Sequence, residues 1–105
     1  MNLFEAFDKK PNEELVEIIA RGKNVRIERI VSSGETSPEG FWYDQNEDEL
    51  VLLLQGTAII AFETRETTLK QGDWMIIPKH QKHRVAYTCK NPLTVWLCIF
   101  GTGLY

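Results

Sequence analysis

The side chains best suited to chemistry in this chain lie around Glu49 and His83. Imidazole and carboxylate groups coordinate divalent metal ions and also transfer protons, so this pair can form either kind of site. With His80 added, the three side chains nominally form a set of two histidines and one carboxylate. His80 falls in a turn before the strand that carries His83, so we expect it at a rim or in solvent rather than on a metal.

Other catalytic and binding motifs are absent from the sequence. There is no glycine-rich phosphate loop, no nucleophile elbow and no CxxC pair, so nucleotide hydrolysis, serine hydrolase chemistry and zinc-finger folds have no support. The net charge is −3, and Lys and Arg do not cluster. This distribution argues against nucleic acid and anionic membranes as partners. We expect a small-molecule ligand instead.

Targeting signals are also missing. The N-terminus has no apolar signal-peptide region, and no later segment is long enough to span a membrane. We therefore expect a cytoplasmic protein. In that compartment Cys89 and Cys98 need no disulfide, and we interpret both as small core or strand residues.

The elements that would position these side chains are short strands. A chain of 105 residues with 43% hydrophobic residues is long enough for one domain with one core. Short apolar runs separated by Gly, Pro, Asn and Asp are typical of an all-β sandwich or barrel. The predicted strands cover residues 25–32, 41–44, 50–55, 57–63, 67–70, 74–78, 84–89 and 94–100.

The start of the chain is predicted in two pieces. Residues 14–20 fit both a helical stripe and strand alternation, and we favour a strand because Gly22-Lys23-Asn24 would turn the chain into the next strand. Residues 1–11 are predicted to form an arm that leans on the barrel or on a partner subunit through Phe4 and Phe7.

The last predicted strand suggests an assembly. Residues 94–100 offer apolar side chains to both faces of their sheet, with Trp96 on one face and Leu97 on the other. One face should belong to the core, and the other needs cover because monomers rarely expose a large apolar patch. The arm or a second subunit would supply that cover, and we expect a homodimer.

Residues 72–87 carry a family resemblance. They resemble the second cupin motif, G-x5-P-x-G-x2-H-x3-N, with Gly72, Pro78 and His83 on its fixed positions. His80 stands where the motif has glycine, and Tyr87 stands where it has asparagine.

Residues 41–56 resemble the first cupin motif, G-x5-HxH-x3/4-E-x6-G, in its second half only. Glu49 is followed by six residues and then Gly56, as the motif requires. The histidine half is missing. Depending on the spacing, the residues that fall on the two histidine positions are Tyr43 and Gln45, or Trp42 and Asp44.

The resemblance covers nearly the whole chain after Arg26. It implies a single cupin domain over residues 1–105, an all-β jelly-roll barrel or double-stranded β-helix with a short N-terminal arm. In that fold the faces carrying Glu49 and His83 both point inward. An imidazole and a carboxylate would then meet in a mostly apolar cavity, which is costly unless they coordinate a metal or form hydrogen bonds.

The resemblance implies two kinds of site. In the first, His83 and Glu49 hold a divalent Fe, Mn, Ni or Zn ion, with Gln45 or Tyr43 at a vacated histidine position. In the second, the pair is metal-free and hydrogen-bonded, and the cavity binds a small ligand. Tyr43 and Tyr87 are the candidate proton donors or acceptors in either site.

Three functions remain open at this level, because the cupin barrel hosts many activities. The first is a metal-dependent enzyme that acts on a small polar organic molecule. The second is a binding or sensing module without catalysis, for which the missing histidines are the main support. The third is an oligomerising structural domain whose barrel is filled by Trp42, Trp74 and Leu53.

Overall fold

The computed structural model describes residues 1–5 and 8–104, and within them the chain forms strands and no helix. Consequently no helix in this part of the chain could span a membrane. The eight strands are β1 (Leu15–Arg21), β2 (Val25–Ser32), β3 (Asp48–Gln55), β4 (Thr57–Phe62), β5 (Glu66–Lys70), β6 (Trp74–Ile77), β7 (His83–Thr88) and β8 (Thr94–Gly101).

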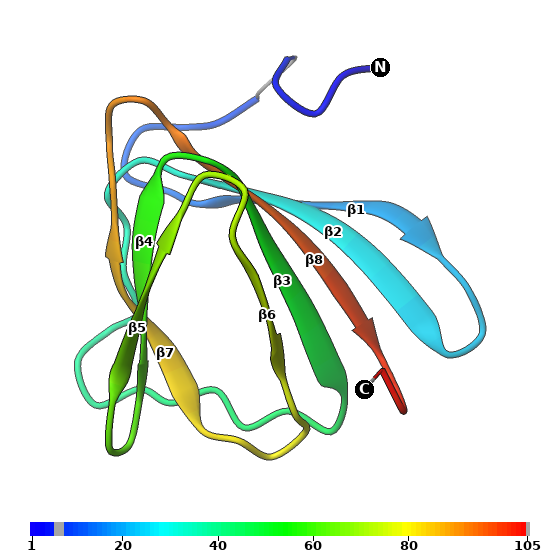
Figure 1. The fold of residues 1–105 in the computed structure, drawn as a ribbon. Helices are drawn as coiled ribbons and strands as arrows, with labels where there is room; N and C mark the ends of the chain where they lie inside the picture. The colour runs from blue at the N-terminus through cyan, green and yellow to red at the C-terminus, as the bar shows by residue number, and fades with distance from the viewer. Residues whose placement is uncertain (6–7, 105) are drawn as a thin grey trace.

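The strands form two antiparallel sheets that face each other (Figure 1). The larger sheet has the order β1-β2-β8-β3-β6, and the smaller sheet has the order β5-β4-β7. The hairpin of β1 and β2 extends beyond the smaller sheet (Figure 1). This is the expected all-β jelly roll, and strand β1 confirms that residues 14–20 favour a strand over a helix.

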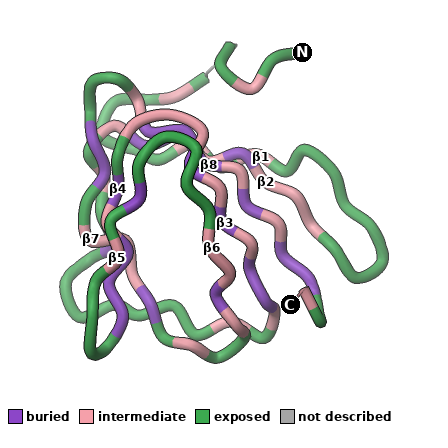
Figure 2. Tube along the Cα trace, in the orientation of Figure 1, coloured by how far each residue is buried: buried purple, intermediate pink, exposed green. Residues whose placement is uncertain are grey.

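The core lies between the two sheets. Residues on β3 alternate between buried and half-buried positions, as expected when one face packs inward (Figure 2). Leu53 is fully buried, and β3 is covered on both edges by β8 and β6. That central position explains why the run of apolar residues at 50–54 forms a strand.

Two expectations about the aromatic residues are wrong. Residues 41–44 do not form a strand, because the segment pairs with β7 at one residue only, through an isolated bridge between Tyr43 and His83. Trp74 is 62% exposed and Trp42 is 37% exposed. These two indoles therefore do not fill the barrel, and the interpretation as a solidly packed structural domain fails.

The N-terminal arm is held by a buried arginine. Arg29 of β2 is 7% exposed, and its Nη1 donates to the backbone carbonyls of Asn2, Leu3 and Glu5 at 2.9–3.3 Å. Phe4 is about half exposed, so in this chain hydrogen bonds to the backbone, rather than the Phe4 ring, hold residues 2–5 against β2. Phe7 lies outside the described residues.

Asp48 ties two loops to the start of β3, beside Glu49. Its Oδ1 accepts the backbone N–H of Lys79 at 2.9 Å, and its Oδ2 accepts that of Leu104 at 3.2 Å. The hydrogen bond from Lys79, with a smaller contribution from that of Leu104, holds the pKa of the Asp48 carboxyl below its usual range.

We expect Asp48→Asn to lower the melting temperature by several degrees at neutral pH, because the amide keeps one acceptor and loses the charge. A depressed carboxyl pKa stabilises the fold above the pKa of the unfolded chain, and this contribution is lost as the pH falls through the folded pKa. Melting curves of wild type and variant should therefore converge in acid. Asp8→Asn, at an exposed position, is the control, and a pH-independent difference would contradict the assignment.

Candidate functional site

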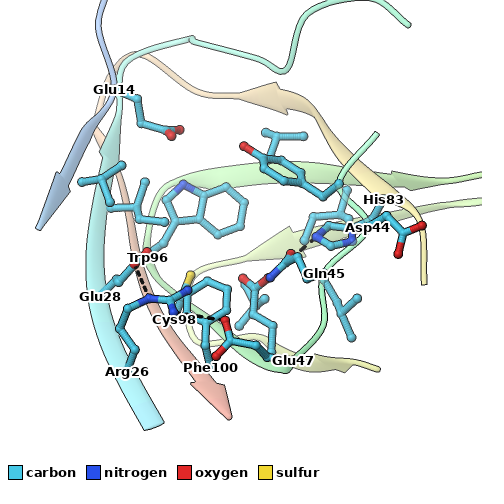
Figure 3. A pocket seen from close by; sticks show the side chains of 18 of the residues that line it. Glu14, Arg26, Glu28, Asp44, Gln45, Glu47, His83, Trp96, Cys98 and Phe100 are labelled. Atoms are coloured by element: carbon cyan, nitrogen blue, oxygen red, sulfur yellow. Dashed lines mark hydrogen bonds and ion pairs between the residues drawn. The ribbon is translucent and has the colours of Figure 1, made fainter. Parts of the chain in front are cut away.

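A cavity of about 750 Å³ opens between the two sheets. Its walls are mostly apolar side chains from both sheets: Ile30, Val51, Ile60, Ile77, Val85, Trp96 and Phe100. Polar side chains enter it from β2, β3, β7 and the loop before β3 (Figure 3). This combination of apolar walls with a few converging polar groups is typical of a small-molecule site.

Glu49 and His83 meet inside this cavity from opposite sheets. Glu49 lies on β3 and is 7% exposed, while His83 begins β7 and is 5% exposed. His83 Nε2 lies 3.7 Å from Glu49 Oε1, which is too far for a direct hydrogen bond. The structure therefore brings together the two side chains that the sequence motifs single out.

The orientation of the imidazole is set by the chain before β7. His83 Nδ1 lies 2.9 Å from the backbone oxygen of Gln81. Because a carbonyl oxygen only accepts, Nδ1 carries a proton, and Nε2 is the ring nitrogen that faces Glu49 across the cavity.

Tyr43 is placed against His83 by backbone and ring contacts. Its N–H donates to the His83 carbonyl at 2.7 Å, and the His83 N–H donates back at 3.2 Å. The two rings stack with centroids 5.3 Å apart. Desolvation raises the pKa of the Tyr43 phenol, and the carboxylates of Glu14 and Glu49 raise it further. The phenol of Tyr43, which lines the cavity, therefore stays protonated.

Gln45 and His80 lie on neighbouring loops at the mouth of the site. Gln45 lines the cavity, and its backbone oxygen accepts the N–H of His80 at 2.7 Å. The His80 ring is exposed and its Nδ1 lies 2.9 Å from Asp44 Oδ1, which confirms its expected rim position. His80 has φ 64°, so this turn keeps the left-handed backbone for which glycine is favoured.

Comparisons with known proteins agree with this architecture. The family model of the cupin domain matches residues 28–100. The chain belongs to the cupin family. A comparison with curated proteins finds no match.

Solved structures resemble this cupin over nearly its full length. A proposed mannose-6-phosphate isomerase from Ralstonia eutropha JMP134 is 38% identical, with a TM-score of 0.92 over 98% of this chain and 97% of that one. A cupin superfamily protein from Desulfitobacterium hafniense DCB-2 is 25% identical, with a TM-score of 0.76 over 91% and 84%. An RmlC-like cupin from Desulfovibrio desulfuricans, 17% identical with a TM-score of 0.74 over 95% and 93%, shares the fold.

Tyr87 does not lie where strand alternation predicts. Ile59 pairs with Tyr87 and Ile60 with Val85, so Ala86 is an extra residue in β7. This bulge shifts the alternation by one position. Tyr87 is consequently 45% exposed and does not line the cavity, whereas Val85 does. The structure therefore does not bring Tyr87 to the candidate site.

Sequence reasoning missed a charged cluster on the inner face of β2. Arg26 Nε donates to Glu28 Oε2 at 2.7 Å and its Nη1 to Glu47 Oε1 at 3.1 Å. The guanidinium also lies over the Phe100 ring, 4.3 Å from its centroid. The alternation of Arg26, Glu28 and Ile30 along one strand face was the signal that could have revealed it.

The two cysteines are free and buried, as expected. Cys98 lines the cavity beside Glu49. Burial, followed by the charge of Glu49, raises the pKa of its thiol well above the usual range. The thiol therefore stays protonated, and Cys98 acts as a small wall residue rather than a nucleophile or metal ligand.

The donor set does not fit the metal that the cupin family implies. Within residues 1–5 and 8–104, no three His, Cys, Asp or Glu side chains gather closely enough to hold an ion. His83 and Glu49 supply one imidazole and one carboxylate, and Gln45 would add only a neutral amide oxygen. A divalent transition metal usually requires more strong donors than this.

Proposed function

We propose that this cupin binds a small organic molecule in the cavity between its sheets and orients it with His83 and Glu49. The observation that carries the proposal is a cavity of about 750 Å³ with apolar walls into which a buried imidazole and a buried carboxylate converge. Burying an imidazole and a carboxylate is costly unless they form hydrogen bonds, and a ligand between them would add to the bonds that His83 makes with Gln81 and Glu49 with Cys98.

The binding role is preferred over metal-dependent catalysis on the chemistry of the donors. His83, Glu49 and Gln45 are the groups that would hold an ion, and they form an incomplete set for Fe, Mn, Ni or Zn. Tyr43 supports the binding role because its protonated phenol would donate a hydrogen bond to the ligand.

We expect Val85→Phe to weaken ligand binding by at least about tenfold, because the larger ring would occupy part of the cavity that Val85 lines. A thermal-shift screen of a metabolite library supplies the ligands, and calorimetry measures their affinities. Tyr87→Phe is the matched control on the same strand, since Tyr87 lies outside the cavity. Equal binding by the two variants would place the ligand elsewhere.

We also expect substoichiometric Fe, Mn, Ni and Zn in untagged protein purified without chelators, with a melting temperature that does not change in EDTA. Elemental mass spectrometry compares wild type with Glu49→Ala and His83→Ala. One ion per chain in wild type, lost in both variants, would overturn the metal-free proposal and favour a metal-dependent enzyme.

The support for a homodimer comes from strand β1. It is an edge strand of the larger sheet, and Val16, Ile18 and Ile19 on it are each about half exposed. Exposed apolar edges promote pairing with another chain. We expect light scattering to give the mass of two chains, and Ile18→Lys to give that of one. A monomeric wild type would contradict this proposal.

A further inference from the structure

We propose that the ligand of this cavity carries a positively charged amine, and that its nitrogen binds between His83 Nε2 and Glu49 Oε1. The inference rests on the proposed function and names the chemical class of the ligand.

The charges of the cavity lining are predominantly negative. The lining contains one guanidinium, that of Arg26, and five carboxylates, those of Glu14, Glu28, Asp44, Glu47 and Glu49. A cavity lined by one sign of charge raises the local concentration of ligands of the opposite sign. This imbalance favours a cation over a neutral molecule and disfavours an anion.

The positive group of the lining is already engaged. Arg26 binds both Glu28 and Glu47 at ion-pair distance and stacks on Phe100. An anionic ligand would have to displace one of these carboxylates to reach the guanidinium. Glu49, in contrast, forms no ion pair with a Lys or Arg among the described residues, and its neighbour across the cavity is His83.

The geometry of the His83 and Glu49 pair suits a nitrogen donor. Nδ1 of His83 donates to Gln81, so Nε2 is the ring nitrogen left to face the cavity, 3.7 Å from Glu49 Oε1. A nitrogen with two N–H groups could lie about 2.9 Å from both atoms at once. An ammonium group would donate to the Glu49 carboxylate and to a lone pair on Nε2, whereas a phosphate or carboxylate would bring a second negative charge beside Glu49.

The aromatic side chains of the cavity lining also suit a ligand that carries an amine. Tyr43, Trp96 and Phe100 line the same cavity. Aromatic faces attract cations and also cover apolar carbon, so the amine would be carried on an apolar or aromatic body. The chemistry differs from that of a sugar phosphate, the ligand that the name of the Ralstonia relative would suggest.

Benzylamine, benzyl alcohol and benzoate test the inference, because they share one ring and differ in charge. Mannose 6-phosphate is the fourth probe. Titrations at pH 7, followed by amide chemical shifts of the uniformly labelled protein, give the affinities. We expect benzylamine to bind about tenfold more tightly than benzyl alcohol, with shifts at residues lining the cavity, and the two anions to bind more weakly than either.

Tighter binding of benzoate or mannose 6-phosphate would overturn the inference and leave the proposed function standing. No binding of benzylamine at millimolar concentration would overturn it as well. The metabolite-library screen then decides separately whether the cavity binds any small molecule, so the two failures are distinguishable.

Glu49→Gln isolates the charge, since it keeps the size of the side chain. We expect benzylamine to bind this variant no better than benzyl alcohol does. Glu66→Gln is the matched control, because Glu66 is exposed on β5 and lies outside the cavity. A tenfold preference for the amine that survives in Glu49→Gln would contradict the assigned contact. The probe comparison on wild type does not depend on how stably the variant folds.

Discussion

Gly56→Ala is expected to lower the free energy of unfolding by about 3 kcal/mol or more. Gly56 has φ +90°, and a Cβ there would lie 2.7 Å from Cys89 Sγ and 3.1 Å from Thr94 Cα. The sulfur cannot move easily, because it accepts the Thr57 N–H at 3.2 Å and lies 3.1 Å from the Pro92 carbonyl. Steric overlap therefore adds to backbone strain.

Gly72→Ala provides a matched comparison. Gly72 has nearly the same φ, +91°, but a Cβ there would meet no atom within 4 Å. Only the backbone strain remains, and we expect a loss of about 1–2 kcal/mol. Urea denaturation measures both variants. Cys89→Ala should restore part of the stability of Gly56→Ala, and equal losses for the two glycines would show that the overlap with Cys89 does not matter.

The second large effect is expected from the buried pair. His83→Leu removes the hydrogen bond to the Gln81 carbonyl and leaves the buried Glu49 carboxylate facing an apolar side chain, and we expect a loss of about 2 kcal/mol. The double variant His83→Leu/Glu49→Leu should lose less than the sum of the two single variants, by about 1–3 kcal/mol, because two leucines suit the apolar cavity.

Equilibrium unfolding in urea at pH 7 measures the wild type, the two single leucine variants and the double variant, which together form a double-mutant cycle. His80→Asn is the control histidine variant, because the exposed His80 pairs with Asp44 at the surface and asparagine tolerates its left-handed backbone. We expect it to cost less than about 1 kcal/mol. Strict additivity of the His83 and Glu49 variants would show that the two side chains do not interact.

The predictions that the structure confirms depend on residues that are close together in the sequence. Gly72 supplies the positive φ of a tight turn, and residues flanking it form strands as their apolar alternation predicts. The segment predicted at residues 14–20 forms strand β1, at Leu15–Arg21, for the same reason. Glu49 and His83 each fall on a position of a cupin motif, and the resemblance to that family implied the inward positions that both side chains have in the cavity.

The errors arise where strand pairing changes a local pattern. Strict alternation places Tyr87 on the face of His83, but the bulge at Ala86 moves it outward. A bulge is created by the partner strand, β4, which is distant in sequence. The segment around Tyr43 likewise has strand-like residues, yet it meets β7 at one bridge only.

The sequence alone thus determined the cupin fold, the inward-facing pair of Glu49 and His83, and the rim position of His80. The tertiary structure decided how large the cavity is and which charges enter it, including those of Arg26 and Glu47. The physical reason is that turn geometry and side-chain alternation act within a few residues, whereas a cavity and its charge balance depend on how separate strands pack against one another.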